Sequence, residues 1–145
     1  MLEYKVNSCE YDIRDFIKKI AIEEYHLEYW KDWIDSQQYD ELKNLPNLLI
    51  SVEDDKRLVG ICSIKEVTSD ECCLNSFYID KAYRNRGIGS IVFRTCEYYA
   101  KKFYKKIVLC TDPVFDGAIR FYEKRKFIFD YYDEERRELH YYKEF

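Results

Sequence analysis

The hydrophobic residues of the chain recur with two different periods, and the changes between these periods divide the chain into elements. Alternating residues over 2–6 predict a short strand, and apolar residues at helical spacing over 9–25 predict an amphipathic helix with Ser8 as its N-cap. A second, weaker helical pattern covers residues 27–43 and ends at Pro46. The chain is therefore expected to open with one strand and two helices.

Three apolar, strand-like runs follow, over residues 47–53, 57–67 and 72–80. The short polar segments between them, DDK and TSDE, are typical of tight turns. Because strands joined by tight turns pair antiparallel, we expect a meander in this part of the chain.

The second half of the chain alternates between helical and strand-like patterns. The sequence predicts a helix over 88–103, a strand over 106–111, a helix over 116–126 and two strands around the charged turn DEERR. The element order β-α-α-β-β-β-α-β-α-β-β, without repeats or a linker, predicts one α/β domain over residues 1–145. The apolar stripe of the helix over 88–103 is predicted to contain Ile88, Ile91, Val92, Thr95, Cys96, Tyr99 and Phe103.

Composition favours a globular protein without a membrane partner. Of the 145 residues 47% are hydrophobic, which is enough to build a core. The first residues are polar and acidic, unlike a signal peptide, and no stretch has the length of a membrane span. None of the six cysteines forms a C-x-x-C pair, so we expect buried free thiols in a reducing, cytoplasmic setting and no metal site.

The net charge of −4 is unevenly distributed along the chain. Residues 81–126 hold twelve Lys and Arg against four Asp and Glu, whereas residues 1–47 hold six against eleven. The first region suits an anion and the second a cation. The overall acidity, together with the expected burial of one helix face in the basic region, argues against nucleic-acid binding.

Two of the four glycines, Gly87 and Gly89, follow Arg84 and Arg86 where the third predicted helix begins. A helix N-terminus presents unpaired N–H groups and the positive end of the helix dipole, and glycine allows close approach of an anion. The pattern predicts a pyrophosphate on the amides of about residues 86–90. A glycine turn into a buried helix explains the same pair, and neither the P-loop pattern nor the G-x-G-x-x-G fingerprint is present.

The segment RNRGIG resembles R/Q-x-x-G-x-G/A, the signature of the GNAT superfamily of acetyl-CoA-dependent N-acetyltransferases. YIDKAY before it is similar to the strand end and loop of that family, and AIRFYEKRKF is similar to its second cofactor motif, A-I-x-x-Y-x-K-x-G-F. The element order fits as well, so the resemblance covers nearly the whole chain. It implies a mixed, mostly antiparallel sheet of about seven strands flanked by about four helices.

The resemblance also implies a reaction, in which a primary amine directly attacks acetyl-CoA in a ternary complex. The strand before the loop splays from its neighbour and pairs with the pantetheine arm, and a backbone N–H near Ile79 polarises the thioester carbonyl. Tyr122 matches the tyrosine that protonates the leaving thiolate, although a core aromatic is the alternative among 15 tyrosines. The implied cofactor-binding residues are Phe77, Tyr78 and Ile79 for the arm, and Arg84, Arg86, Gly87, Ile88, Gly89 and Ser90 for the pyrophosphate.

Three positions depart from the family pattern. Phe115 replaces an asparagine that contacts the cofactor, Lys126 replaces a glycine and suggests an altered helix end, and Cys73 replaces a glutamate general base. No base is therefore assigned, and proton loss through ordered water is the expected route. Candidate relays are Glu71, Asn75, Asp112, Glu23 and Glu24. For His26 and His140 a structural role is favoured over a role in proton transfer.

The aromatic residues of the first third either line the acceptor pocket or pack the first two helices on the sheet. They are Tyr25, Tyr29, Trp30 and Trp33, whose faces suit a cation. The acidity of this region is compatible with a cationic acceptor such as a polyamine, an aminoglycoside, a lysine or a peptide N-terminus.

Alternative functions and assemblies remain open at this point. A non-catalytic acyl-CoA-binding or regulatory module fits the departures at Phe115 and Cys73, whereas the retained Tyr122 favours an enzyme. A covalent acetyl-cysteine step on Cys73 or Cys110 lacks a His/Asp partner in the sequence. Pairing of the final aromatic strands in a homodimer and an intramolecular hairpin explain those strands equally well.

Overall fold

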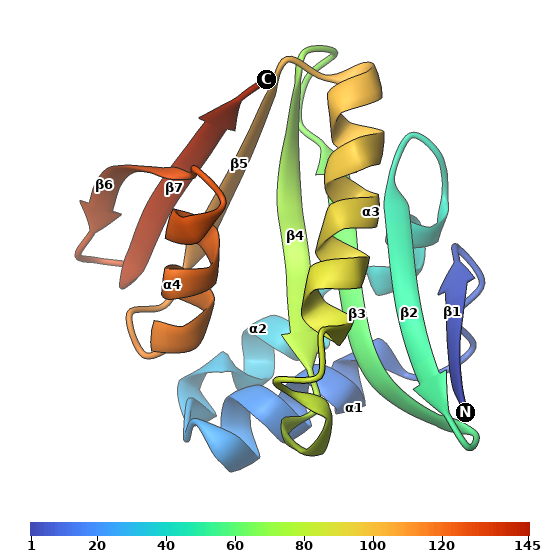
Figure 1. Cartoon of the computed structure of the whole chain (residues 1–145). Coiled ribbons are helices and arrows are strands. Elements are labelled where there is room, and N and C mark those ends of the chain that lie inside the picture. Colours follow the sequence, from blue (N-terminus) through green and yellow to red (C-terminus); the bar gives the residue numbers. More distant parts are fainter.

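A mixed sheet of seven strands forms the centre of the computed structural model, which describes every residue from Met1 to Phe145 (Figure 1). The strand order is β1-β2-β3-β4-β5-β7-β6, and all neighbours pair antiparallel except β4 and β5. The predicted α/β class and meander are confirmed, and the last two strands pair within the chain as a hairpin. The strands are β1 (Leu2–Val6), β2 (Leu48–Asp54), β3 (Arg57–Glu66), β4 (Glu71–Ile79), β5 (Lys106–Thr111), β6 (Ile128–Asp133) and β7 (Glu138–Glu144).

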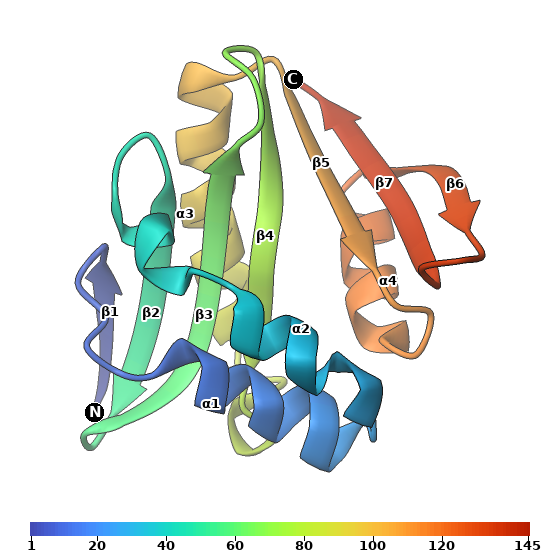
Figure 2. The same cartoon turned by 180° about the vertical axis from the view of Figure 1, so that it is seen from behind.

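Helices cover both faces of this sheet. Figure 1 shows α3 and α4 in front of one face, and Figure 2 shows α1 and α2 across the lower end of the other. None of the helices is both long and apolar enough to cross a membrane. The α-helices are α1 (Ile13–Lys18), α2 (Lys31–Ser36), α3 (Ile88–Phe103) and α4 (Asp116–Lys124); η1 (Lys19–Glu24) is a π-helix, and η2 (Glu28–Trp30), η3 (Tyr39–Lys43) and η4 (Lys81–Tyr83) are 3₁₀ segments.

The first helix begins later than predicted. Asp12, not Ser8, is its N-cap, because the Asp12 carboxylate accepts hydrogen bonds from the backbone N–H groups of Arg14 and Asp15. After six residues α1 continues directly as the π-helix η1, a wide and rare turn that is frequent at functional sites. The hydrophobic period predicted a helix here but did not distinguish these two forms.

Residues 27–43 form three short segments rather than one helix. Their buried residues are Leu27, Ile34, Tyr39 and Leu42, whose irregular spacing does not maintain one apolar face along a helix. The predicted second helix is therefore wrong in length, since α2 holds six residues.

Helix α3 has the predicted bounds, and its buried stripe matches the predicted one only in part, at Ile88, Val92 and Cys96. The predicted members Ile91, Thr95 and Phe103 are exposed, because the helix packs on the sheet along a row of residues four apart. Its buried residues are Ile88, Val92, Phe93, Cys96 and Ala100.

Two hydrophobic cores lie on opposite faces of the sheet. Ile50 and Val52 of β2 face the core beneath α3 and α4, whereas Leu49 of β2 and Ile61 of β3 face the core beneath α1 and α2. Because helices cover both faces, β2 is a nearly continuous buried run rather than an alternating one.

Strands β4 and β5 are joined only at one end. Their parallel ladder holds three residue pairs and ends at Cys73 and Val108. On the other edge of β4 the register with β3 shifts between Ser76 and Leu74, so that Asn75 is an extra residue, a β-bulge. The bulge bends β4 where it leaves β5, and the two strands diverge toward the end that carries α1 and the loop before α3 (Figures 1 and 2).

Lys126 ends α4 in a conformation that favours glycine. Its φ is +75°, its N–H donates to the Glu123 carbonyl, and the Phe127 N–H donates to the Tyr122 carbonyl. These two bonds form a Schellman motif, and the rings of Tyr122 and Phe127 pack at 5.7 Å between centroids, as is common beside that motif. The helix end is therefore the usual one, and the expectation that Lys126 alters it is wrong.

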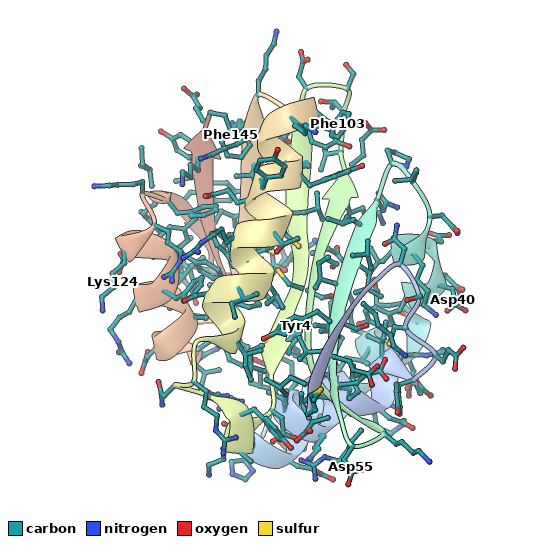
Figure 3. All side chains as sticks on the ribbon, turned by 45° about the vertical axis from the view of Figure 1, so that its right-hand side comes forward. Tyr4, Asp40, Asp55, Phe103, Lys124 and Phe145 are labelled. Atoms are coloured by element: carbon teal, nitrogen blue, oxygen red, sulfur yellow. The ribbon has the colours of Figure 1, made fainter.

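We expect Lys126→Gly to raise the free energy of unfolding by about 0.5–1 kcal/mol, because glycine adopts a positive φ without the strain of a Cβ. Urea denaturation followed by circular dichroism measures the change. Lys124→Gly is the matched control: Lys124 is a helical residue on the outside of α4 (Figure 3), so glycine there should destabilise by about 0.5–1 kcal/mol. Equal destabilisation by both variants would contradict the assignment.

Candidate functional site

The divergence of β4 and β5 opens a cleft of about 370 Å³ that is lined from both faces of the sheet. One side is formed by the start of α3 and by α4, and the other by η1, η2 and the segment before α4. Of the predicted site residues, Phe77, Tyr78, Ile79, Arg84, Gly87, Gly89, Ser90 and Tyr122 line it. Arg86 and Ile88 lie outside the lining.

The two glycines at the start of α3 meet different requirements. Gly87 is the N-cap with a φ of +82°, and no atom lies within 4 Å of where a Cβ would be. Gly89 lies in the first turn, where a Cβ would stand 3.4 Å from the Phe77 ring. The first glycine thus permits the turn and leaves open space above it, whereas the second lies at contact distance from the Phe77 ring of β4.

The N-terminus of α3 has no internal cap. No side chain accepts a hydrogen bond there, and the N–H of Ile91 is the donor to the carbonyl of the N-cap Gly87, at 3.2 Å. The preceding N–H groups of the first turn are orphan donors, as at any helix start. Gly87, Gly89 and Ser90 line the cleft, so these donors and the positive end of the dipole of a 16-residue helix are at its wall.

Arg84 is held by protein groups. Both terminal nitrogens of its guanidinium donate to the Glu24 carboxylate, one of them at 2.7 Å, and its Nε donates to the Ile79 carbonyl at 2.9 Å. The pair is largely shielded, with side chains 27% and 19% exposed, so it is stronger than an ordinary surface pair. Through these contacts Arg84 links η1 to the end of β4. Its predicted contact with a pyrophosphate stays a prediction.

Arg86 and Ile88 are placed differently from their neighbours in the motif. The Arg86 guanidinium lies over the Tyr83 ring, 5.1 Å from its centroid, on an exposed residue. The Ile88 side chain is 2% exposed and belongs to the core. Ile88 thus has only its backbone to offer an anion.

Tyr122 is almost fully buried yet reaches the cleft. It is 5% exposed and packs between the rings of Phe77 and Phe127, at centroid distances of 6.3 and 5.7 Å. Burial raises the pKa of its hydroxyl well above the ordinary value of tyrosine. The phenol is therefore protonated throughout the neutral range and is a donor, not an acceptor, of a proton.

No aspartate or glutamate lines the cleft. Glu24 is bound to Arg84, Glu71 lies 3.8 Å from Lys106, and the 3% exposed Asp112 accepts from the Tyr29 hydroxyl and Arg137. Of the candidate relays, Asn75 alone lines the cleft, at the bulge of β4. The lining also excludes Glu23 and His26.

His140 lies outside the cleft lining and is held by its neighbours. It is stacked on Tyr131 with ring centroids 4.2 Å apart, and its Nε2 is 3.1 Å from Glu138. Asp133, Glu138 and His140 place one ligand atom each within 4.8 Å of one another.

The thiols are free, and those beside the cleft are not activated. Cys110 is an exposed residue, unlike the buried thiols expected, and it lines the cleft, where partial desolvation and the Glu138 carboxylate raise the pKa of its thiol to about 11. Burial raises the pKa of Cys73 to about 12. Because the thiolate is the nucleophilic form, neither cysteine is poised for a covalent step at neutral pH.

Aromatic side chains close the cleft on the side of α1. Tyr25 and Trp30 pack against Phe115, at 4.7 and 5.7 Å between ring centroids, and all three line the cleft. Tyr29 and Trp33 are 63% and 53% exposed and lie outside the lining. The four aromatic residues considered from the sequence therefore divide into two that face the cleft and two that face solvent.

Sequence reasoning missed Arg125. Its guanidinium stacks on the Phe121 ring, 3.3 Å from the centroid, and donates to the Ser90 hydroxyl at 2.9 Å. It lies in a groove of about 260 Å³ that shares Ser90 with the cleft. The excess of cations over residues 81–126 was the only sequence signal for this groove. Its charged lining residues are Arg94, Glu97, Arg125, Lys126 and Lys143.

Comparison with known proteins identifies relatives of this arrangement. The sequence profile of the acetyltransferase (GNAT) family matches residues 11–127. By sequence, no curated protein matches the chain.

Solved acetyltransferases share the fold over essentially the whole chain. One from Streptococcus agalactiae 2603 aligns with a TM-score of 0.79 at 20% identity, over 99% of this chain and 98% of its own. A GNAT-family acetyltransferase from Staphylococcus aureus Mu50 aligns with a TM-score of 0.83 at 17% identity, over 99% of both chains. One from Elizabethkingia anophelis, solved with acetyl-CoA bound, aligns with a TM-score of 0.73 at 16% identity, over 99% and 98%. At these identities the likeness shows a shared fold.

Alkylation of Cys110 by iodoacetamide should be slow at pH 8 and should accelerate about tenfold per pH unit up to about pH 11, because only the thiolate reacts. At pH 8 roughly one thiol in a thousand is ionised at such a pKa. Peptide mapping by mass spectrometry gives the rate at this residue. Glu138→Gln should speed the reaction at pH 8, since the carboxylate holds the pKa up. A rate that levels off below pH 9 would contradict the assignment.

Proposed function

Since the chain belongs to the acetyltransferase (GNAT) family, whose members are acyltransferases that use acetyl-CoA, we propose that it transfers the acetyl group to a primary amine by direct attack in a ternary complex. One observation carries the proposal: the uncapped N-terminus of a long helix opens into a cleft that passes between two diverging strands. The cleft offers donors for a phosphate at one end and an unpaired strand edge along its length.

The pyrophosphate of the cofactor is placed on the first turn of α3. The orphan N–H groups around Gly87, Gly89 and Ser90 supply donors, and the helix dipole favours the negative charge. The open space above Gly87 leaves room for an oxygen at the turn.

The pantetheine arm is placed along β4 beyond its last pair with β5. From Leu74 to Ile79 this edge of β4 has no partner strand, so its backbone groups are free to pair with the amides of the arm. Such pairing directs the thioester toward Tyr78 and Ile79, which line the cleft. A backbone N–H there would stabilise the oxyanion that forms when the amine attacks.

Tyr122 is proposed as the general acid. When the tetrahedral intermediate collapses, the C–S bond breaks and the thiolate of coenzyme A takes the phenolic proton. The Tyr122 hydroxyl is protonated at neutral pH, so its proton is in place when the thiolate forms, and solvent then restores it. The amine loses its own proton to water, because no carboxylate lines the cleft and Asn75 offers only a hydrogen bond to that water.

The ribose 3′-phosphate is placed in the groove of Arg125. A guanidinium that is stacked on Phe121 and bound to Ser90 is held in one orientation, adjacent to the proposed pyrophosphate site. This site accounts for the excess of positive charge over residues 81–126.

We further propose a cytoplasmic location and a homodimer. All six cysteines are free, which supports a reducing compartment such as the cytoplasm. An outer strand, β6, carries the exposed residues Phe129, Tyr131 and Tyr132, which would be the contact of a homodimer.

Acetyl-CoA should bind the protein in isothermal calorimetry, and adding an amine should release a free thiol. Tyr122→Phe should bind acetyl-CoA as tightly but release thiol about 10²–10⁴-fold more slowly, since only the acid is lost. Tyr98→Phe, on an exposed residue of α3, is the control. Absence of acetyl-CoA binding would contradict the proposal. Unchanged turnover by Tyr122→Phe would remove its assigned role, and binding without turnover by the wild type would favour an acyl-CoA-binding module.

Arg125→Gln should weaken the binding of coenzyme A about three- to tenfold and that of 3′-dephospho-coenzyme A distinctly less, because the lost charge is assigned mainly to the 3′-phosphate. Calorimetry with the two ligands measures both effects. Arg120→Gln is the matched control, since Arg120 is an exposed residue of α4 that lines neither the cleft nor the groove. Equal weakening for both ligands would place Arg125 elsewhere in the cofactor site.

A further inference from the structure

We propose that the acceptor is a small monoamine with an aromatic or apolar body, and that Tyr25, Trp30 and Phe115 select it. The inference rests on the proposed function and specifies the substrate class of that same cleft. Its grounds are the aromatic wall on the side away from the proposed cofactor site and the charge of the cleft lining.

The aromatic wall consists of four rings in mutual contact, those of Tyr25, Trp30, Tyr78 and Phe115. Phe115 is at its centre, with Tyr25 at 4.7 Å, Trp30 at 5.7 Å and Tyr78 at 6.4 Å between ring centroids. The rings meet at interplanar angles of 63°, 54° and 78°, which are favourable edge-to-face or tilted arrangements that hold each ring in place. All four are half-buried, so they keep a face or an edge for a ligand.

The same wall comes from three segments far apart in the sequence. Tyr25 follows η1, Trp30 ends η2, Tyr78 lies on β4, and Phe115 is the N-cap of α4. The side chain at the N-cap of α4 is apolar and faces the cleft, where it adds apolar contact area. A flat or aliphatic body of an acceptor would lose contact with water against this surface.

The charge of the cleft opposes a second ammonium group. Its lining contains no carboxylate, and its one cationic side chain is Arg84. The nearby carboxylates of Glu24 and Asp112 are already paired, with Arg84 and Arg137 respectively. A diamine or polyamine would place a further positive charge in the cleft without a counter-charge, which is costly to desolvate.

The rings of the aromatic wall are also not all available to bind a cation. The Arg84 guanidinium already lies over the Tyr25 ring, 5.9 Å from its centroid. A second cation on this wall would meet like charge, whereas an apolar body meets only ring faces and edges. The cationic acceptors expected from the acidic first third are therefore disfavoured, because the acidic residues that suggested them lie outside the cleft lining.

The test compares two primary amines of similar reactivity, 2-phenylethylamine and 1,5-diaminopentane. With saturating acetyl-CoA, kcat/KM from thiol release should be at least tenfold higher for 2-phenylethylamine. Calorimetry on the complex with coenzyme A should show the same order of affinity without any turnover. Equal or higher kcat/KM and affinity for 1,5-diaminopentane would overturn the inference.

Variants locate the selectivity in the wall. Phe115→Ala should lower kcat/KM for 2-phenylethylamine about tenfold and leave that for 1,5-diaminopentane and the binding of acetyl-CoA nearly unchanged. Phe115→Leu, which keeps an apolar side chain, should give an intermediate loss and covers the case in which the alanine variant does not fold. Phe103→Ala is the matched control, because Phe103 is an exposed residue at the far end of α3 (Figure 3).

The outcomes separate this inference from the function on which it rests. A protein that does not bind acetyl-CoA contradicts both the proposed function and the inferred acceptor. A protein that binds acetyl-CoA and acetylates the diamine in preference contradicts only the acceptor. Preference for 2-phenylethylamine that persists in Phe115→Ala and Phe115→Leu would contradict the assignment of selectivity to this wall.

Discussion

The short ladder between β4 and β5 is the constraint on which the rest of the structure depends. Three residue pairs hold two halves of one sheet together, and a single extra residue at Asn75 bends β4 away from its neighbour. Everything proposed for the cofactor follows from that divergence: an unpaired strand edge, an opening through the sheet and a helix N-terminus at its wide end. A complete β4–β5 ladder would close the cleft and leave only a packed α/β sandwich.

Local patterns predicted most of the helices and strands, because each of these elements buries its own apolar residues at a regular spacing. The strand runs, the bounds of α3 and the glycine turn at Gly87 could be read from the sequence, since periodicity and a positive φ depend on few neighbours. The N-cap at Asp12 and the π-helix after α1 could not be read in this way. Both depend on which backbone groups pair in competing arrangements that share the same apolar pattern.

The candidate site was predictable where it follows a motif and not where it depends on contacts between distant segments. The RNRGIG and AIRFYEK segments indicated the helix start and Tyr122, and most of these residues do line one cleft. The pairing of Arg84 with Glu24, the hydrogen bond from Arg125 to Ser90 and the aromatic wall around Phe115 join residues that no local pattern connects. The uneven charge of the chain suggested an anion site and a cationic acceptor, but the acidic residues of the first third lie outside the cleft lining, because charge along a sequence does not show which residues face a cavity.

The Glu24–Arg84 pair has a consequence for how the binding of one ligand affects the binding of the other. Arg84 lies between β4 and the first turn of α3, whereas Glu24 precedes Tyr25 of the aromatic wall. An anion that draws Arg84 toward the turn would release Glu24 and with it the segment that carries the wall. The free energies of the two binding events are then linked through one ion pair, and by reciprocity an acceptor that orders the wall changes the affinity for the donor by the same factor. With such a displacement the pair would be a thermodynamic coupling between the two halves of the cleft as well as a structural contact.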